Sequence, residues 1–237
     1  MLHIPIVFSI SKRMRKDQII SGEYYHVFNR GNNKQPIFLD ESDRIRFLFL
    51  ILYFQSNANL ENISRFVQYF VKHRVFNISE KKKDFMLENK SAELINFAFM
   101  PNHFHMTIRE VKDGGLSRYM QRALNGYTKY FNAKYKRSGH LFQGPFKAVR
   151  VTSNEQLLHL SAYIHRNPRE IKEWRYKEDV FPWSSYQDYV YENRWGEFLR
   201  PSIIIEQISF GKEYKNFVET SGTKKLEEEL DDNFKID

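Results

Sequence analysis

The sequence predicts an α+β protein of ferredoxin-like type, in which helices pack on one face of an antiparallel sheet. The order of the periodic segments supports this fold class, because it runs strand, helical region, two strands, helix, strand and helix. Apolar residues alternate in the strand segments and recur at helical spacing in the others. A chain of 237 residues, of which 41% are hydrophobic, can bury a core of that size.

Four segments have the composition of strands and are bounded by turn residues. Gly31-Asn32-Asn33 ends the first, and Pro101-Asn102 joins the second to the third as a hairpin. The predicted strands are Tyr24–Arg30, Glu93–Met100, His103–Val111 and Phe146–Val151.

Four further segments have helical periodicity. Asp40 or Ser42 can cap the first, which ends near Asn57, and the second covers Ile63–Phe76. An amphipathic helix then runs from Leu116 to Ser138-Gly139, and the last runs from Asn154 to Asn167, ahead of Pro168. The lysine-rich stretch at 79–91 is predicted to be a surface loop, and the aromatic-rich residues 171–210 are expected to pack on the core.

The basic charge is concentrated in one part of the chain. The net charge is +8, and residues 112–150 contain nine basic residues and one acidic residue. Such a segment suits a polyanionic partner, although a solvated helix face would have the same composition. The chain has no cysteine, which excludes disulfides and thiolate zinc sites.

His103 and His105 flank Phe104 in a predicted strand. Because side chains alternate along a strand, both imidazoles point to one side and can bind one divalent metal ion. The alternative, that they only satisfy local hydrogen bonds, stays open.

His159, Tyr163 and Asn167 lie four residues apart and form one stripe on the last predicted helix. A helix packed across the sheet could present Tyr163 and Asn167 to the histidine pair. Imidazole, amide and water ligands suit Mg²⁺ or Mn²⁺. Alternatively, Tyr163 is a buried core aromatic and Asn167 an ordinary helix-terminal residue. His159 and His165 are nearby candidates for a base, but we expect both to be surface histidines.

Two motifs resemble the HUH signature of IS200-like transposases. One is Met100-Pro101-Asn102-His103-Phe104-His105, and the other is Tyr163-Ile164-His165-Arg166-Asn167-Pro168. The Tyr-x-x-x-Asn-Pro spacing is similar to that of the REP-associated branch. The segments Tyr25–Gly31 and Gly139–Gly144 also resemble this family, and the resemblance extends from about Glu23 to Tyr189.

The resemblance implies the HUH endonuclease fold, with Tyr163 as the nucleophile and His103, His105 and Asn167 as ligands of Mg²⁺ or Mn²⁺. It implies a DNA transposase that cuts and rejoins single-stranded DNA containing a hairpin, through a 5′-phosphotyrosine. Residues 1–20 would be an N-terminal extension, 21–190 the endonuclease domain with a helical insertion at about 60–91, and 191–237 a C-terminal extension with an acidic tail from Ser221.

We expect the DNA-binding surface to be built from basic residues of the first strand, the basic helix and the strand at 146–151. The candidates are Arg30, Arg118, Arg122, Lys129, Lys136, Arg137, Lys147 and Arg150.

The expected location is the bacterial cytoplasm, associated with the nucleoid, with no membrane contact, as a monomer or homodimer. The longest apolar run, Leu48–Phe54, is far shorter than the roughly 20 residues that span a bilayer. The N-terminal apolar stretch precedes its basic cluster, the reverse of a secretory signal.

Two other functions stay open. A domesticated regulator could bind DNA hairpins without cleaving them, using the same basic segment. A metal-dependent hydrolase of small molecules would explain His103 and His105, but it would leave the charge distribution without a role.

Overall fold

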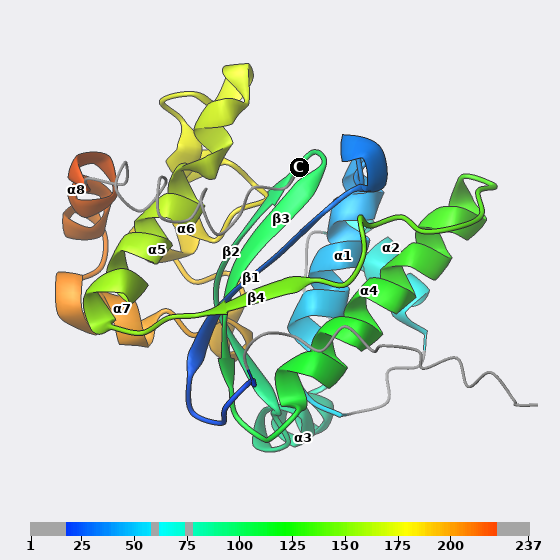
Figure 1. The fold of residues 1–237 in the computed structure, drawn as a ribbon, viewed down its shortest axis with the longest axis horizontal. Coiled ribbons are helices and arrows are strands. Elements are labelled where there is room, and N and C mark those ends of the chain that lie inside the picture. The colour runs from blue at the N-terminus through cyan, green and yellow to red at the C-terminus, as the bar shows by residue number, and fades with distance from the viewer. Residues whose placement is uncertain (1–17, 58–61, 74–77, 222–237) are drawn as a thin grey trace, which may run out of the picture.

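The computed structural model describes residues 18–57, 62–73 and 78–221. Four strands form one antiparallel sheet in the order β2-β3-β1-β4 (Figure 1). They are β1 Tyr24–Arg30, β2 Ala92–Met100, β3 His103–Glu110 and β4 Lys147–Arg150. Each predicted strand is present, and the α+β fold with the ferredoxin-like strand order is confirmed.

Helices cover both faces of the sheet, so the prediction that they pack on one face is wrong (Figure 1). The helices α1 Glu41–Tyr53 and α4 Gly115–Lys134 pack on one face, and α5 Asn154–Arg166 packs on the other. The reason lies in β2, whose nine residues are all buried. A strand that is apolar on both faces must be covered on both.

The first helix begins at Asp40, as predicted. The Asp40 side chain accepts from the backbone of Asp43, and Asp43 in turn accepts from the backbone of Asp40. The buried Asp43 also binds Lys134 at the end of α4, at 2.8 Å. This contact joins the two helices of that layer.

The stretch at 79–91, predicted to be a loop, contains the helix α3 Glu80–Glu88. Its one buried residue is Met86, which packs in the core with α1, while Lys82 overlies the Phe66 ring and Lys83 pairs with Glu197. Met86 and the partly buried Leu87 hold a run of good helix formers against the core, although the segment shows no clear amphipathic pattern. The helix α2 Ile63–His73 also packs on α1.

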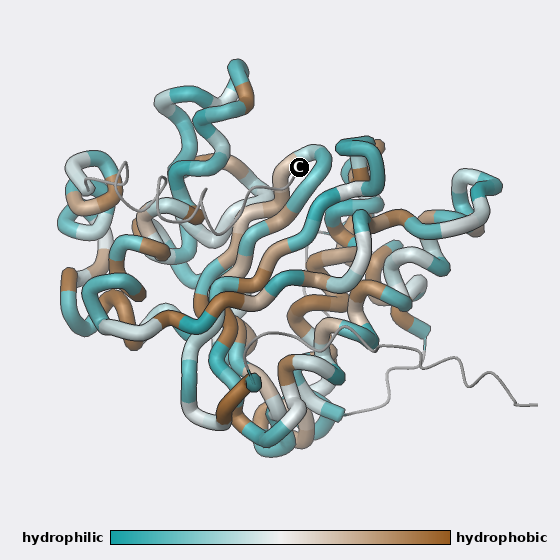
Figure 2. The backbone as a smooth tube through the Cα atoms, in the orientation of Figure 1, coloured by the Kyte–Doolittle hydropathy of each residue, from teal (hydrophilic) through white to brown (hydrophobic). Residues whose placement is uncertain are grey.

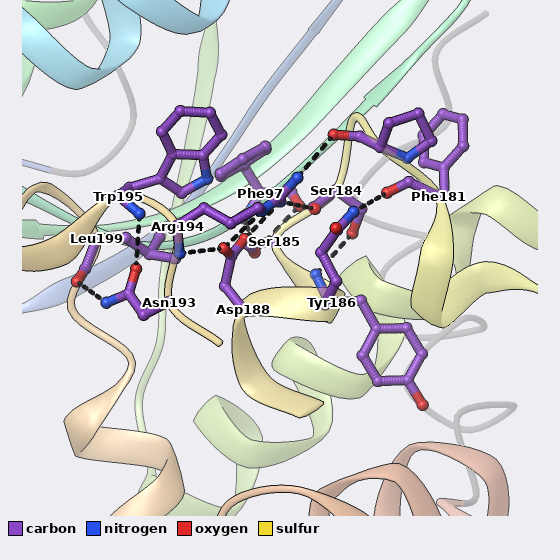
Figure 3. A network of polar contacts seen from close by, with 12 residues as sticks. Phe97, Phe181, Ser184, Ser185, Tyr186, Asp188, Asn193, Arg194, Trp195 and Leu199 are labelled. Atoms are coloured by element: carbon purple, nitrogen blue, oxygen red, sulfur yellow. Dashed lines mark hydrogen bonds and ion pairs between the residues drawn. The ribbon is translucent and has the colours of Figure 1, made fainter. Parts of the chain in front are cut away.

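The C-terminal part of the described chain packs around α5 and closes the β2 edge. Ser185 donates from its backbone to the carbonyl of Phe97, and the Arg194–Asp188 ion pair, at 2.7 Å, holds the turn that follows (Figure 3). The remaining helices are α6 Tyr186–Val190, α7 Ser202–Ile208 and α8 Lys212–Thr220, with short 3-10 helices at Asn32–Lys34, Asn167–Glu170, Lys172–Trp174, Glu178–Val180 and Gly196–Phe198.

The apolar residues form two clusters, one on each side of the sheet. Hydrophobic segments follow the strands and α1, whereas the segments that project beyond the sheet are mostly hydrophilic (Figure 2). No helix within the described ranges is long and apolar enough to cross a membrane. The predicted extension at 1–20 lies almost wholly outside the described residues, as does the acidic tail after Ser221.

A buried polar network attaches α5 to the C-terminal helices. The ring nitrogens of His165 bond to the Tyr214 hydroxyl at 2.7 Å and to Ser185 Oγ at 2.8 Å. His165 is fully buried, so the expectation that it is a surface histidine is wrong. Because both ring nitrogens are engaged, the ring fixes the rotation of α5 about its axis.

Lowering the pH from about 7 to about 4 is expected to reduce the free energy of unfolding. Burial lowers the pKa of His165 to about 3, whereas its value in the unfolded chain is about 6.5. Between these values the unfolded chain binds a proton that the folded protein excludes, so stability is lost as the pH falls. Urea unfolding at a series of pH values measures how steeply the free energy of unfolding falls as the pH is lowered. His165→Gln should make that slope shallower, and His140→Gln, at an exposed site, should not; equal slopes in all three proteins would contradict the assignment.

Candidate active site

The register between β1 and β3 gathers the histidines on the sheet face that α5 covers. Phe28 pairs with His105, and Arg30 pairs with His103. Because alternate residues share a face, His26, Arg30, His103 and His105 all point toward α5. The three histidines are called the histidine row. The sequence predicts the common face of His103 and His105, and the structure has it.

Tyr163 of α5 lies against this row. Its ring centroid is 5.5 Å from that of His105 and 6.0 Å from that of His26, and in both contacts the rings meet edge to face. The Tyr163 side chain is partly exposed. It is therefore not a fully buried core aromatic. As predicted, the helix places Tyr163 beside His105 of the strand.

Asn167 ends α5 beside His103. Its Oδ1 lies 3.5 Å from His103 Nε2, and its Nδ2 donates to the carbonyl of Tyr163 at 3.2 Å. That second bond turns the amide oxygen, not the nitrogen, toward the imidazole. The amide oxygen of Asn167 thus faces the same space as Nε2 of His103, where it could serve as a metal ligand.

The hairpin between β2 and β3 fixes the tautomer of His103. Asn102 Nδ2 donates to the carbonyl of Lys34, so its Oδ1 is the atom that contacts His103 Nδ1, at 2.7 Å. Both amide oxygens only accept, and the contact of Asn102 Oδ1 with Nδ1, at 2.7 Å, is much shorter than that of Asn167 Oδ1 with Nε2, at 3.5 Å, so the ring proton is assigned to Nδ1 and a neutral His103 keeps a lone pair on Nε2. Two lone pairs, on Nε2 and on Asn167 Oδ1, therefore face each other, as they do around a shared cation.

His26 was missed in the sequence analysis. Its Nε2 lies 2.9 Å from His105 Nδ1, and both rings are buried. If His105 donates from Nδ1, its Nε2 keeps a lone pair, which matches the arrangement at His103. Metal-bound histidines are oriented by such partners on the second ring nitrogen. The alternation His26, Phe28, Arg30 was visible in the sequence, but the partner strand and its register were not.

Burial keeps these imidazoles neutral at physiological pH. It lowers the pKa of His103 to about 4, with a further decrease from the nearby Arg30 charge. Burial also lowers the pKa of His105 well below 6.5 and that of His26 to about 3. The neutral form of an imidazole is the form that can bind a metal ion.

A divalent cation fits this donor set. Within the described ranges, no group of three His, Cys, Asp or Glu side chains is placed to hold a metal ion. An ion here would take Nε2 of His103, Nε2 of His105 and Oδ1 of Asn167, leaving other positions for water and phosphate. Two imidazoles and an amide do not make a closed zinc site, whereas open positions suit Mg²⁺ or Mn²⁺.

The two other histidines of α5 do not join the row. His165 points into the C-terminal network. His159 Nδ1 bonds to Ser221 Oγ at 2.7 Å, and its Nε2 lies 3.9 Å from Glu155. Neither contact leads to the Tyr163 hydroxyl.

Two of the predicted DNA-binding residues share the face of the site. Arg30 is next to His103 across the strands, and Lys147 pairs in register with the backbone of Phe28 and overlies its ring at 5.9 Å. Among the described residues neither cation forms a salt bridge with a carboxylate. Both are therefore available to an anion.

Lys136 and Arg137 lie in the loop that follows α4. This loop is attached to the end of β1, because Gln143 donates to the carbonyl of Arg30 and Asn29 donates to that of Gly144. Residues 143–144 of the loop thus reach the Arg30 end of the sheet. Lys136 and Arg137 stay at the end of α4, where Arg137 donates from its backbone to the carbonyl of Asn132 and overlies the Phe131 ring, so the structure does not bring them to the site.

The remaining four predicted cations do not reach the site either. Three of them, Arg118, Arg122 and Lys129, project from α4, on the opposite face of the sheet. The Arg122 guanidinium donates to the carbonyl of Ser56 and stacks on a neighbouring ring, so it holds the fold. Arg150 is three residues after Lys147 in β4, so its side chain lies on the face opposite α5, where it pairs with Glu23 at 2.9 Å. Helical periodicity locates a charged stripe, but it does not give the sheet face on which the helix packs.

Comparison with known proteins agrees with the motifs. The family described as "Transposase IS200 like" matches residues 65–167, which include His103, His105, Tyr163 and Asn167. No curated protein matches the chain. A solved REP-associated tyrosine transposase bound to a REP hairpin matches 74% of this chain and 84% of its own, at 15% identity and a TM-score of 0.46. The family match confirms the resemblance to IS200-like transposases.

The tautomers of the histidine pair can be measured directly. Long-range proton–nitrogen NMR spectra at about pH 7 are expected to show His103 and His105 protonated on Nδ1 only. Asn102→Ala should convert His103 to a mixture of tautomers, and His26→Leu should do the same for His105. The exposed His140 serves as the internal control. A wild-type His103 or His105 protonated on Nε2 would contradict the arrangement.

Proposed function

Because residues 65–167 match the IS200-like transposases, we propose that this chain is a metal-dependent single-tyrosine DNA endonuclease and strand transferase. Its substrate is single-stranded DNA that contains a hairpin. The observation that carries the proposal is the position of Tyr163, whose ring lies edge-on to His105 while Asn167 Oδ1 lies 3.5 Å from His103 Nε2. A phenol and a set of neutral nitrogen and oxygen ligands thus border one place where a phosphate can bind.

The resemblance to the IS200-like transposases implies the following reaction at these groups. The Tyr163 oxygen attacks phosphorus and loses its proton, the bond from phosphorus to the 3′ oxygen breaks, and that oxygen leaves as a 3′-hydroxyl. The DNA 5′-phosphate is then joined to Tyr163. The phosphodiester bond energy is retained in the phosphotyrosine, so a 3′-hydroxyl can reverse the step and join a strand without ATP. A divalent ion bound at His103, His105 and Asn167 would neutralise charge on the non-bridging phosphate oxygens.

The chain's own residues prepare this step in two ways. Arg30 and Lys147 supply positive charge on the same sheet face, so the DNA backbone is drawn across the Tyr163 side of the sheet. Asn102 contacts Nδ1 of His103, and His26 contacts Nδ1 of His105; a proton on each of these Nδ1 atoms leaves Nε2 free to bind the metal ion. Tyr163 needs a metal ion or another group to stabilise the transition state, because a phenol with a pKa of about 10 is a poor nucleophile at neutral pH.

The alternative proposal is a regulator that binds DNA hairpins without cutting them. It uses the same cations and the same fold. The position of Tyr163 beside the ligand set favours the nuclease, since a binding module has no use for a phenol held against neutral imidazoles.

Replacing Tyr163 with phenylalanine is expected to abolish covalent capture of DNA, because the attacking oxygen is removed. Single-stranded DNA that contains a hairpin with unpaired flanks is incubated with the protein and Mn²⁺, and SDS-resistant adducts are counted by gel. Tyr24→Phe is the matched control, since Tyr24 is partly exposed on the same sheet face and should leave the adduct unchanged. An adduct that survives Tyr163→Phe would refute the assignment, and hairpin binding without an adduct in the wild type would favour the regulator.

Metal removal should also prevent the adduct. EDTA is expected to abolish it, and Mn²⁺ to restore it. His103→Ala and Asn167→Ala should each weaken Mn²⁺ binding by about a hundredfold or more, because each removes a ligand from a small donor set. Calorimetric titration with Mn²⁺ measures the affinity without relying on cleavage, and His140→Ala is the control. Unchanged Mn²⁺ affinity in both variants would exclude this ligand set.

A further inference from the structure

A short segment directly after the site residues presents an aromatic side chain to solvent. Tyr176 is 84% exposed, and the next most exposed large hydrophobic residues in the described chain reach 54%. The segment that contains it continues from Asn167 and Pro168, so it starts at the site. In Figure 1 it is the yellow-green projection above the end of α5, at the same end of the sheet as the β2–β3 hairpin.

The backbone at Tyr176 is strained in a way that the surroundings maintain. Its φ is +69°, in the left-handed region that non-glycine residues rarely adopt. Its N–H donates to Glu178 Oε1 at 3.2 Å, and that carboxylate is buried and also pairs with Arg169. Strain of this kind persists only where other contacts impose it, and it is concentrated at functional positions.

The chemistry around the ring suits a nucleic acid strand. Arg175 and Lys177 flank Tyr176, and both are exposed. Residues 172–177 contain three basic residues and one acidic residue, and the projection is mostly hydrophilic (Figure 2). An exposed aromatic ring between cations can stack on an unpaired base while the cations contact phosphates.

We propose that Tyr176 is a stacking platform for an unpaired base of the DNA strand that enters the site, with Arg175 and Lys177 holding the adjoining phosphates. The inference rests on the proposed function, because it takes single-stranded DNA as the substrate. The segment adds a contact that neither the sequence motifs nor the histidine row provides.

The test measures binding of a fluorescein-labelled single-stranded DNA that contains a hairpin with unpaired flanks, by anisotropy and without divalent metal, to full-length protein. Tyr176→Ala is expected to weaken binding about tenfold, and Tyr176→Phe, which keeps the stacking ring, to change it by less than about twofold. Phe85→Ala is the matched control, since Phe85 is an exposed aromatic on α3 at the other end of the sheet (Figure 1).

A further variant separates binding from folding. Glycine adopts a positive φ without strain, so Tyr176→Gly should leave the urea midpoint unchanged or raise it, while DNA binding weakens as in Tyr176→Ala. A ring needed only for the fold would instead lower the midpoint in the glycine variant. Quenching of 2-aminopurine placed at successive positions of the strand should identify the stacked base, and Tyr176→Ala should abolish that quenching.

The outcomes distinguish the two proposals. If wild-type protein binds the strand and Tyr176→Ala binds it equally well, the stacking role is refuted while the nuclease proposal stands. If the wild type binds no single-stranded DNA, both are refuted. If Tyr176→Ala loses capture of another protein but keeps DNA binding, the segment is a protein-binding surface and the stacking role is again refuted.

Discussion

The pairing of β1 with β3 is the constraint on which the site depends. A slip of one residue would turn His103 and His105 to the opposite face, and Phe104 would leave the core. The alternating apolar residues of β3 oppose that slip, because they are buried between the sheet and the α1–α4 layer. The hydrophobic pattern of one strand therefore holds the core and orients the histidines by the same register.

The second constraint is the rotation of α5. Tyr163 faces the histidine row only if the helix is fixed about its axis, and His165, two residues further on, is fixed by Tyr214 and Ser185. Residues 181–218, which supply these partners, thus do more than cover the sheet. They hold the helix from the side opposite the reacting groups, so the position of Tyr163 depends on residues far from it in sequence.

Local patterns in the sequence predicted the strands, the common face of His103 and His105, and the stripe that joins Tyr163 to Asn167. These follow from periods of two and 3.6 residues, which need no knowledge of the fold. The second helical layer, the pairing of His26 with His105 and the remote position of Arg118 depend on which face each helix covers and on which strands pair. Strand pairing and helix placement depend on contacts between residues far apart in the sequence, and the packing of the whole core determines them. The helix α3 was missed for a different reason, since one buried methionine leaves no periodic signal.

The histidine row combines neutral imidazoles with the fixed charge of Arg30. Arg30 disfavours protonation of His103 and His105, and by the same electrostatics it opposes a bare divalent ion. A phosphate placed between Arg30 and the ion would relieve that repulsion. On the proposed function, metal and DNA then bind cooperatively, because each brings the charge that the other needs. On that proposal, the metal site is complete only when the DNA is bound, because the buried side chains that would hold the ion carry no charge.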